Sequence, residues 1–307
     1  MYGGRENMAD FRAVICNCTI GGDKFTLKKG GGHIRNHLEL QLSGYAVDLY
    51  QTEEAILGNR SDLKNRWNHT TEVVVSNVAP EYVDKIKVMI TDLTNLLSFV
   101  SVSRVWPYGW EYPDQSGYGS FISTTGTTQY FRPVIDICDG SKVANFINQT
   151  WRPYQKYKRK RKLPEVIDYL VKADLPQQPV ELQLIILFVV LENLKDTWAR
   201  VQRIPYAYGY FRRISIPPKP NIRKEPTYSF EELLSQMLKS VGMRRGLKRI
   251  IKLRNQIIHS GLSRRPFRSN QKTYENCQDI VREYLLKLLK FSGSFYPYTS
   301  PNWINII

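Results

Sequence analysis

Three polar side chains that could take part in catalysis lie close together in the sequence: Arg254, Asn255 and His259. Apolar residues recur around them at helical spacing, and Gly261 follows as a helix stop. These apolar positions are Leu247, Ile250, Leu253 and Ile257. On a helix, Asn255 and His259 lie nearly above one another, whereas Arg254 is about 140° away from His259. The spacing therefore permits one Arg–Asn–His site without requiring it.

These residue types suit the cleavage of RNA. A histidine takes or gives a proton near neutral pH, a guanidinium stabilises charge on a phosphate, and an amide orients either neighbour. With the 2′-OH of RNA as nucleophile such a site needs no metal, and the sequence lacks the acidic cluster of a two-metal nuclease. The alternative is structural: His259 would then be a favourable charge at a helix C-terminus, and Arg254 would cap or form a salt bridge.

Charge is distributed unevenly along the chain. Residues 1–150 contain 14 Lys and Arg against 16 Asp and Glu, a net charge of −2, whereas residues 151–307 contain 30 against 12, a net charge of +18. One basic half favours binding to a polyanion, most commonly nucleic acid, and a solvated basic face without a ligand is the alternative. The densest basic run, residues 156–162, is either a solvated linker or a set of phosphate contacts.

The cysteines and the apolar runs argue against several other classes. The four cysteines are too dispersed for a disulfide framework, and the close pair Cys16 and Cys18 lacks partners for a zinc site. We expect all four to be reduced in a cytoplasmic protein, with no cofactor. The first ten residues lack the apolar region of a signal peptide. The most apolar run, Leu182 to Leu191, is shorter than the ~20 residues that span a bilayer, so no membrane partner is expected.

The first 150 residues show the pattern of a β-containing region with one long helix. Apolar alternation and turn residues predict strands, and apolar residues at helical spacing predict a helix over residues 77–103. The predicted strands cover residues 11–16, 24–27, 37–42, 72–76 and 130–138. We interpret residues 1–150 as a recognition or sensor domain, followed by a basic linker at residues 151–163.

From residue 164 to residue 307 the pattern predicts helices only. Ser229 and Glu232 form a capping-box signature at the start of one of them, and residues 206–226, rich in Tyr, Pro and Arg, are predicted to be a loop. The predicted helices cover residues 163–172, 179–200, 229–241, 247–260 and 270–291. The expected fold class is therefore α+β, with a β-rich N-terminal region and an all-helical C-terminal bundle.

The segment Arg254-Asn255-x-x-x-His259 resembles the Arg-x4–6-His motif of the HEPN superfamily. Its apolar flanks, the following Gly261 and the earlier helix segment Phe188 to Glu192 also fit that motif. Within the HEPN superfamily the chain resembles the Apea-like family, in which a β-containing region precedes the helical domain. The resemblance covers roughly residues 160–290.

The resemblance implies a helical bundle that forms a homodimer, with the Arg and His of both subunits lining one cleft. Many members are metal-independent endoribonucleases that leave 2′,3′-cyclic phosphate ends and act in phage defence or as toxins paired with an antitoxin. Carried over, Arg254 would stabilise the scissile phosphate, His259 would be the acid or base, and Asn255 would hold the polar position after the Arg. The expected substrate-binding residues are Glu192, Arg249, Lys252, Lys158, Arg159, Lys160 and Arg161.

RNA, a second copy of the chain and a cognate antitoxin or regulatory protein are the expected partners. Some HEPN proteins lack nuclease activity, so a non-catalytic module that binds RNA or a partner is the alternative.

Overall fold

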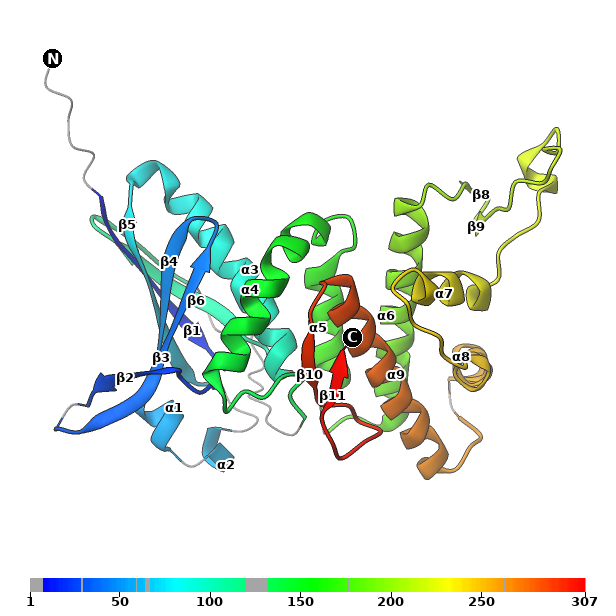
Figure 1. Cartoon of the computed structure of the whole chain (residues 1–307). Coiled ribbons are helices and arrows are strands. Elements are labelled where there is room, and N and C mark those ends of the chain that lie inside the picture. The colour runs from blue at the N-terminus through cyan, green and yellow to red at the C-terminus, as the bar shows by residue number, and fades with distance from the viewer. Residues whose placement is uncertain are drawn as a thin grey trace, which may run out of the picture.

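The computed structural model describes residues 8–28, 30–58, 60–63, 67–119, 132–175, 177–261 and 263–306. Figure 1 shows an antiparallel sheet at one end of the molecule, helices α3 and α4 beside it, and the remaining long helices beyond them. The buried apolar side chains form one continuous cluster that extends from Phe11 in the sheet to Ile306 near the C-terminus. Among the described residues, no helix combines the length and the apolar character needed to cross a membrane.

Seven strands form the sheet, and every neighbouring pair in it is antiparallel. Their order across the sheet is β2-β3-β4-β5-β1-β6-β7. The strands are β1 (Ala9–Cys16), β2 (Lys24–Leu27), β3 (His33–Leu42), β4 (Tyr45–Gln51), β5 (His69–Val78), β6 (Trp106–Tyr112) and β7 (Gln115–Tyr118). Leu38, Leu40 and Leu42 of β3 are buried, as the period-two alternation of its sequence predicts.

The long helix predicted over residues 77–103 is present as α3 (Val83–Ser101), preceded by the 3-10 turn η1 (Pro80–Tyr82). Its apolar residues, among them Ile86, Ile90 and Leu97, are buried, and it contacts strands β1 and β6. Two short helices, α1 (Glu53–Leu57) and α2 (Arg60–Leu63), connect β4 to β5.

The remaining helices follow residue 139 in the chain (Figure 1). Among them, α6 contacts α5, α7, α8 and α9, so it is the helix around which the others pack. Their bounds are α4 (Gly140–Tyr157), α5 (Leu163–Ala173), α6 (Val180–Val201), α7 (Phe230–Lys239), α8 (Lys248–Ser260) and α9 (Phe267–Leu288).

The predicted all-helical C-terminal bundle is wrong. Strands β8 (Tyr206–Ala207) and β9 (Tyr210–Phe211) form a hairpin between α6 and α7, and β10 (Gly293–Phe295) pairs with β11 (Ile304–Ile306) after α9. The C-terminal region therefore mixes helices with strands. These strands are too short for a period-two pattern, which becomes recognisable over about four residues or more.

The region between residues 130 and 157 also differs from its prediction. Residues 132–138 form turns and bends where a strand was expected, and residues 130–131 lie outside the described chain. Helix α4 begins directly afterwards, with the Asp139 side chain accepting the Ser141 N–H at 3.1 Å. The residues expected to be a linker, 151–163, form the second half of α4, a tight turn and the first residue of α5.

Both helix-end signals seen in the sequence are confirmed. Gly261 ends α8 with φ +72°, and its N–H donates to the Ile257 carbonyl at 2.8 Å. At the start of α7, Ser229 Oγ accepts the Glu232 N–H at 3.2 Å, and Glu232 accepts the Ser229 N–H at 2.8 Å. These two ends set the lengths of the helices that surround the candidate site.

The capping box makes the stability of the chain depend on pH. Hydrogen bonds from the Ser229 N–H, Arg213 and the Ser229 hydroxyl lower the pKa of Glu232 from 4.5 to about 2. Since the folded pKa is the lower one, the charged form contributes stability that is complete above pH 4.5 and is lost as the pH falls through about 2.

We therefore expect Glu232→Gln to destabilise the chain in urea at about pH 6, and the difference from wild type to shrink as the pH falls from 4.5 towards about 2, where the carboxylate becomes protonated in the folded state as well. Glu231→Gln, at the neighbouring exposed position, is the control. A difference for Glu232→Gln that does not change with pH would contradict the assignment.

Candidate active site

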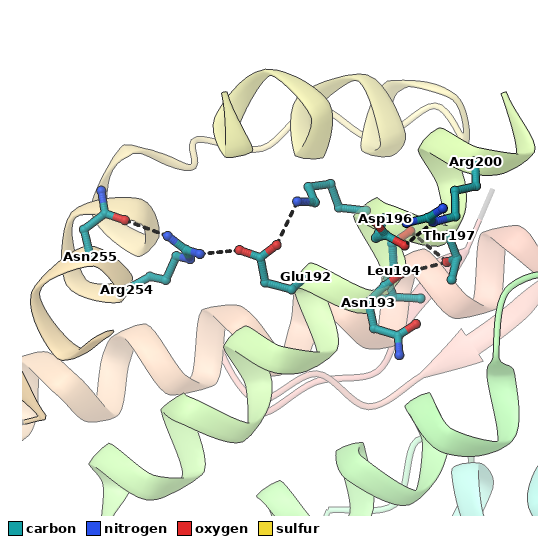
Figure 2. Close-up of polar contacts among 9 residues, drawn as sticks. Glu192, Asn193, Leu194, Asp196, Thr197, Arg200, Arg254 and Asn255 are labelled. Atoms are coloured by element: carbon teal, nitrogen blue, oxygen red, sulfur yellow. Dashed lines mark hydrogen bonds and ion pairs between the residues drawn. The ribbon is translucent and has the colours of Figure 1, made fainter. Parts of the chain in front are cut away.

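Arg254 and Glu192 form the centre of the candidate site. Arg254 projects from α8, and its Nη2 forms an ion pair with Glu192 Oε1 on α6. Its Nη1 donates to Asn255 Oδ1 at 2.9 Å. Figure 2 shows the three side chains in a row, with the guanidinium between the carboxylate and the amide. Thus the structure brings together three of the predicted site residues, Arg254, Asn255 and Glu192.

Helix α7 completes the surroundings of this pair. The Arg254 Cζ lies 4.7 Å from the centre of the Phe230 ring, and the Lys195 Nζ lies 5.4 Å from it. Lys195 also binds the second oxygen of Glu192, with an N–O distance of 2.7 Å. Glu192 is consequently held by two cations, and an aromatic ring supports both of them.

The Arg254 side chain is only 23% exposed, and its Nε is buried without an acceptor among the described groups. Because little water surrounds a half-buried guanidinium, its electrostatic attraction for an anion is screened only weakly. The two outer nitrogens form the fork that binds carboxylates and phosphates in the same planar geometry. An incoming phosphate would therefore compete with Glu192 for Nη2 and with Asn255 for Nη1.

A cavity of about 680 Å³ opens beside this group. Its volume lies within the range of roughly 300–1,000 Å³ that is typical of ligand sites. Charged residues on its wall are Lys162, Glu192, Lys195, Asp196 and Arg254. Aromatic residues on its wall are Tyr206, Tyr210, Phe211, Tyr228 and Phe230. The cavity thus combines cations with aromatic rings. They are supplied by α6, the β8–β9 hairpin, α7, α8 and the connections that precede α5 and α7.

His259 is not part of this cavity within one chain. It is exposed on the last turn of α8, and no hydrogen bond or ion pair joins it to a described residue. The helical rotation between Arg254 and His259, about 140°, accounts for the separation. Ile258 beside it is 52% exposed, so the end of α8 presents an apolar residue and a histidine together.

The predicted basic run at residues 156–162 serves more than one purpose. Lys158 forms an ion pair with buried Asp92 of α3, while Arg159 and Lys160 are exposed and Lys162 lines the cavity. The Arg161 side chain is buried, and its guanidinium donates to the Leu194 carbonyl at 2.8 Å, to Thr197 at 3.1 Å and to Tyr284 at 2.7 Å. Arg161 therefore connects α6 and α9 and is not free to contact a phosphate.

The two remaining predicted binding residues lie on other sides of α8. Arg249 donates to Ser269 Oγ at 3.0 Å and lines a separate cavity of about 250 Å³ between α8 and α9. Lys252 is exposed. Neither lines the cavity that contains Arg254.

Three kinds of contributor to the cavity were not among the predicted residues: Lys195, Phe230 and the hairpin tyrosines. The position of Lys195 could be predicted, because it follows Glu192 by one helical turn in a segment predicted to be helical. For the tyrosines the sequence indication is weaker and consists of the alternation of Tyr206, Tyr208 and Tyr210. No sequence pattern indicates Phe230, since its position depends on how α7 packs on α6.

The buried cysteines supply no competing nucleophile. Burial raises the pKa of Cys16 to about 11 and that of Cys18 to about 12, so both remain thiols at neutral pH. No cluster of three or more His, Cys, Asp or Glu side chains that could hold a metal ion occurs in the described part of the chain.

No protein-family model, no curated protein and no solved structure matches this chain. Its function is therefore inferred from the residues and their geometry.

The basic run allows a direct test of which cations are structural. We expect Arg161→Ala to lower the free energy of unfolding by roughly 2–4 kcal/mol, because it removes the guanidinium that donates to the buried Thr197 hydroxyl on α6 and the Tyr284 hydroxyl on α9 and leaves a cavity. The exposed Arg159→Ala should change it by less than about 0.5 kcal/mol. Urea unfolding of both variants measures the difference, and equal stability would contradict a structural part for Arg161.

Proposed function

We propose that the chain is a metal-independent endoribonuclease that acts as a homodimer in the cytoplasm, in phage defence or in a toxin-type stress response. The main support is the half-buried Arg254–Glu192 pair at the wall of a 680 Å³ cavity, in the half of the chain that carries a net charge of +18. The spacing of Arg254 and His259, and its resemblance to the HEPN motif, adds the proton-transfer group.

The proposed reaction is an internal transfer within the RNA. The 2′-oxygen forms a bond to phosphorus while the bond from phosphorus to the 5′-oxygen breaks, which leaves a 2′,3′-cyclic phosphate and a 5′-OH. The proton of the 2′-OH passes to a base, and the leaving 5′-oxygen receives one from an acid. His259 serves in proton transfer, and Arg254 stabilises the negative charge that accumulates on the phosphate oxygens.

Glu192 and Lys195 prepare Arg254 for this task. The carboxylate holds the guanidinium fork in one orientation before RNA binds, which reduces the entropy lost on binding. When a phosphate takes the place of the carboxylate, Lys195 remains as the counterion of Glu192 at 2.7 Å. The carboxylate is therefore not left without a partner during the exchange.

A second copy of the chain would supply the missing histidine. His259 is exposed and lies outside the cavity lined by its own Arg254, and it follows the exposed apolar residue Ile258. Two α8 helices related by a twofold axis would bury Ile258 of both copies and bring each His259 towards the other copy's Arg254. The site would then be composed of residues from both chains.

Cleavage of labelled total RNA in excess EDTA tests the activity. We expect His259→Ala to reduce the rate by about 10²- to 10⁴-fold, the usual contribution of a proton-transfer group. The exposed His33→Ala in β3 is the matched control and should cleave like wild type. Cleavage by His259→Ala at the wild-type rate, or products without a cyclic phosphate, would contradict the assigned mechanism.

The composite site makes a separate prediction for mixed subunits. Arg254→Ala and His259→Ala should each be inactive alone, whereas a refolded mixture contains heterodimers in which one of two sites keeps both residues. We expect the mixture to recover about a quarter of the wild-type activity, because about half of the dimers are mixed and each has one intact site. Equal amounts of each variant and of wild type are compared by initial rates. A mixture as inactive as its components would contradict a site shared between chains.

The alternative function is a non-catalytic module that binds RNA or a partner such as a cognate antitoxin. It is supported by the engagement of the Arg254 guanidinium with both Glu192 and Asn255 in the free chain. In that case RNA binding would depend on salt, and His259→Ala would bind as wild type without any cleavage in either protein.

A further inference from the structure

The β8–β9 hairpin presents three tyrosines to solvent. Tyr208 and Gly209 form its turn, with φ of +55° and +82°, the positive pair typical of a type I′ turn. Tyr206, Tyr208 and Tyr210 are 49%, 57% and 58% exposed. Figure 1 shows the hairpin at the end of the molecule opposite the sheet, next to α6. A group of exposed aromatic rings on one surface hairpin is typical of a site that binds a ligand or a partner.

An arginine lies against each of these rings. The Cζ of Arg223 lies 3.8 Å from the centre of the Tyr208 ring. The Cζ of Arg200 lies 4.9 Å from the centre of the Tyr206 ring, and that of Arg212 lies 5.6 Å from the centre of the Tyr210 ring. These contacts hold the rings in place before a ligand arrives, and Arg223 pairs with no carboxylate in the described chain.

The segment from residue 200 to residue 228, which contains the hairpin, is anchored and carries an excess of positive charge. Arg200 pairs with Asp196 and Arg213 with Glu232, whereas its other Lys and Arg side chains form no ion pair with a described carboxylate. Between residues 200 and 228 the sequence has seven Lys and Arg and one acidic residue, Glu225. Glu225 is buried, and hydrogen bonds from the Ser215 hydroxyl and the Lys219 N–H lower its pKa. Arg212 donates to the Glu225 carbonyl at 2.9 Å, which fixes the segment to β9. The only carboxylate in the segment is therefore used internally.

The hairpin and the candidate site share one cavity. Tyr206, Gly209 and Tyr210 form part of the wall that also contains Arg254. A chain bound on the rings would therefore continue directly to the guanidinium. Cations alternating with exposed rings suit a polymer that alternates negative charge with flat apolar groups, as unpaired nucleotides do. A duplex does not offer free base faces to the rings, because its bases are stacked inside the helix.

We infer that Tyr206, Tyr208 and Tyr210, with Arg200 and Arg223 behind them, form a stacking platform for unpaired nucleotides that leads the RNA strand into the Arg254 cavity. This inference rests on the proposed function, since it names single-stranded RNA as the substrate class of that site. Recognition through ring faces tolerates every base, so the platform selects for an unpaired strand rather than for a particular sequence.

Binding to a strand that cannot be cleaved tests the platform separately from catalysis. The probe is a fluorescent 2′-O-methyl oligonucleotide of roughly 12 nucleotides, whose 2′-oxygen cannot attack the phosphate. We expect Tyr208→Ala and Tyr210→Ala each to raise its Kd by about 5- to 150-fold in fluorescence anisotropy. Tyr208→Phe and Tyr210→Phe, which keep the ring, should bind like wild type. A duplex of the same length should bind more weakly to wild type than the single strand does.

Tyr169→Ala is the matched control. Tyr169 on α5 is 37% exposed and has the Lys172 Nζ 5.7 Å from its ring centre, but it lines no part of the cavity. Its replacement should leave the Kd unchanged. Arg223→Gln should reduce the slope of log Kd against log salt by about 0.7, the contribution of one phosphate contact in a single strand.

Alanine variants at Tyr208 and Tyr210 that bind the strand like wild type would overturn the platform, as would equal affinity for single strand and duplex. Loss of dimerisation in these variants, with strand binding intact, would also overturn it and assign the hairpin to a protein contact. The two proposals fail separately. Tyrosine-dependent binding without RNA cleavage would refute only the endonuclease, whereas His259-dependent cleavage that the tyrosine variants leave unchanged would refute only the platform.

Discussion

The packing of α6 determines most of what lies around the candidate site. Four helices, α5, α7, α8 and α9, contact it, and most of its apolar residues are buried between them. Six of its positions line the cavity, among them Glu192 and Lys195. Since a half-buried carboxylate must be paired, the position of α6 also determines where Arg254 of α8 is stabilised.

The basic character of the second half of the chain has two physical origins. Some of its cations are structural, as for Arg161, whose buried guanidinium joins α6 to α9, and Lys158, which joins the end of α4 to Asp92 of α3. Others, among them Lys162, Arg200 and Arg223, lie at or beside the cavity. A run of positive charge in a sequence therefore overstates the surface that is available to a polyanion, because burial removes individual members from it.

The cavity has polar and aromatic walls of different origin. The rigid helices α6 and α8 supply the ion pair, and the hairpin between α6 and α7 supplies tyrosines on a short turn. Ion pairs on helices hold charge at a defined place, whereas rings on a surface hairpin accept ligands of varied shape. In the proposed function these correspond to the catalytic contact with one phosphate and to the sequence-tolerant contact with neighbouring bases.

The sequence by itself determined the local features. The long helix that became α3, the four first-predicted strands, the capping box at Ser229 and the stop at Gly261 all depend on neighbours a few residues apart, and all are present. Only the tertiary structure decided that short strands accompany the C-terminal helices, that Arg161 is buried, and that Arg254 meets Glu192. These outcomes depend on contacts between residues far apart in the chain, such as the 62 positions between Glu192 and Arg254. The periodicity of apolar residues indicates which face of a helix or strand is buried. Which element packs against that face depends on the tertiary structure.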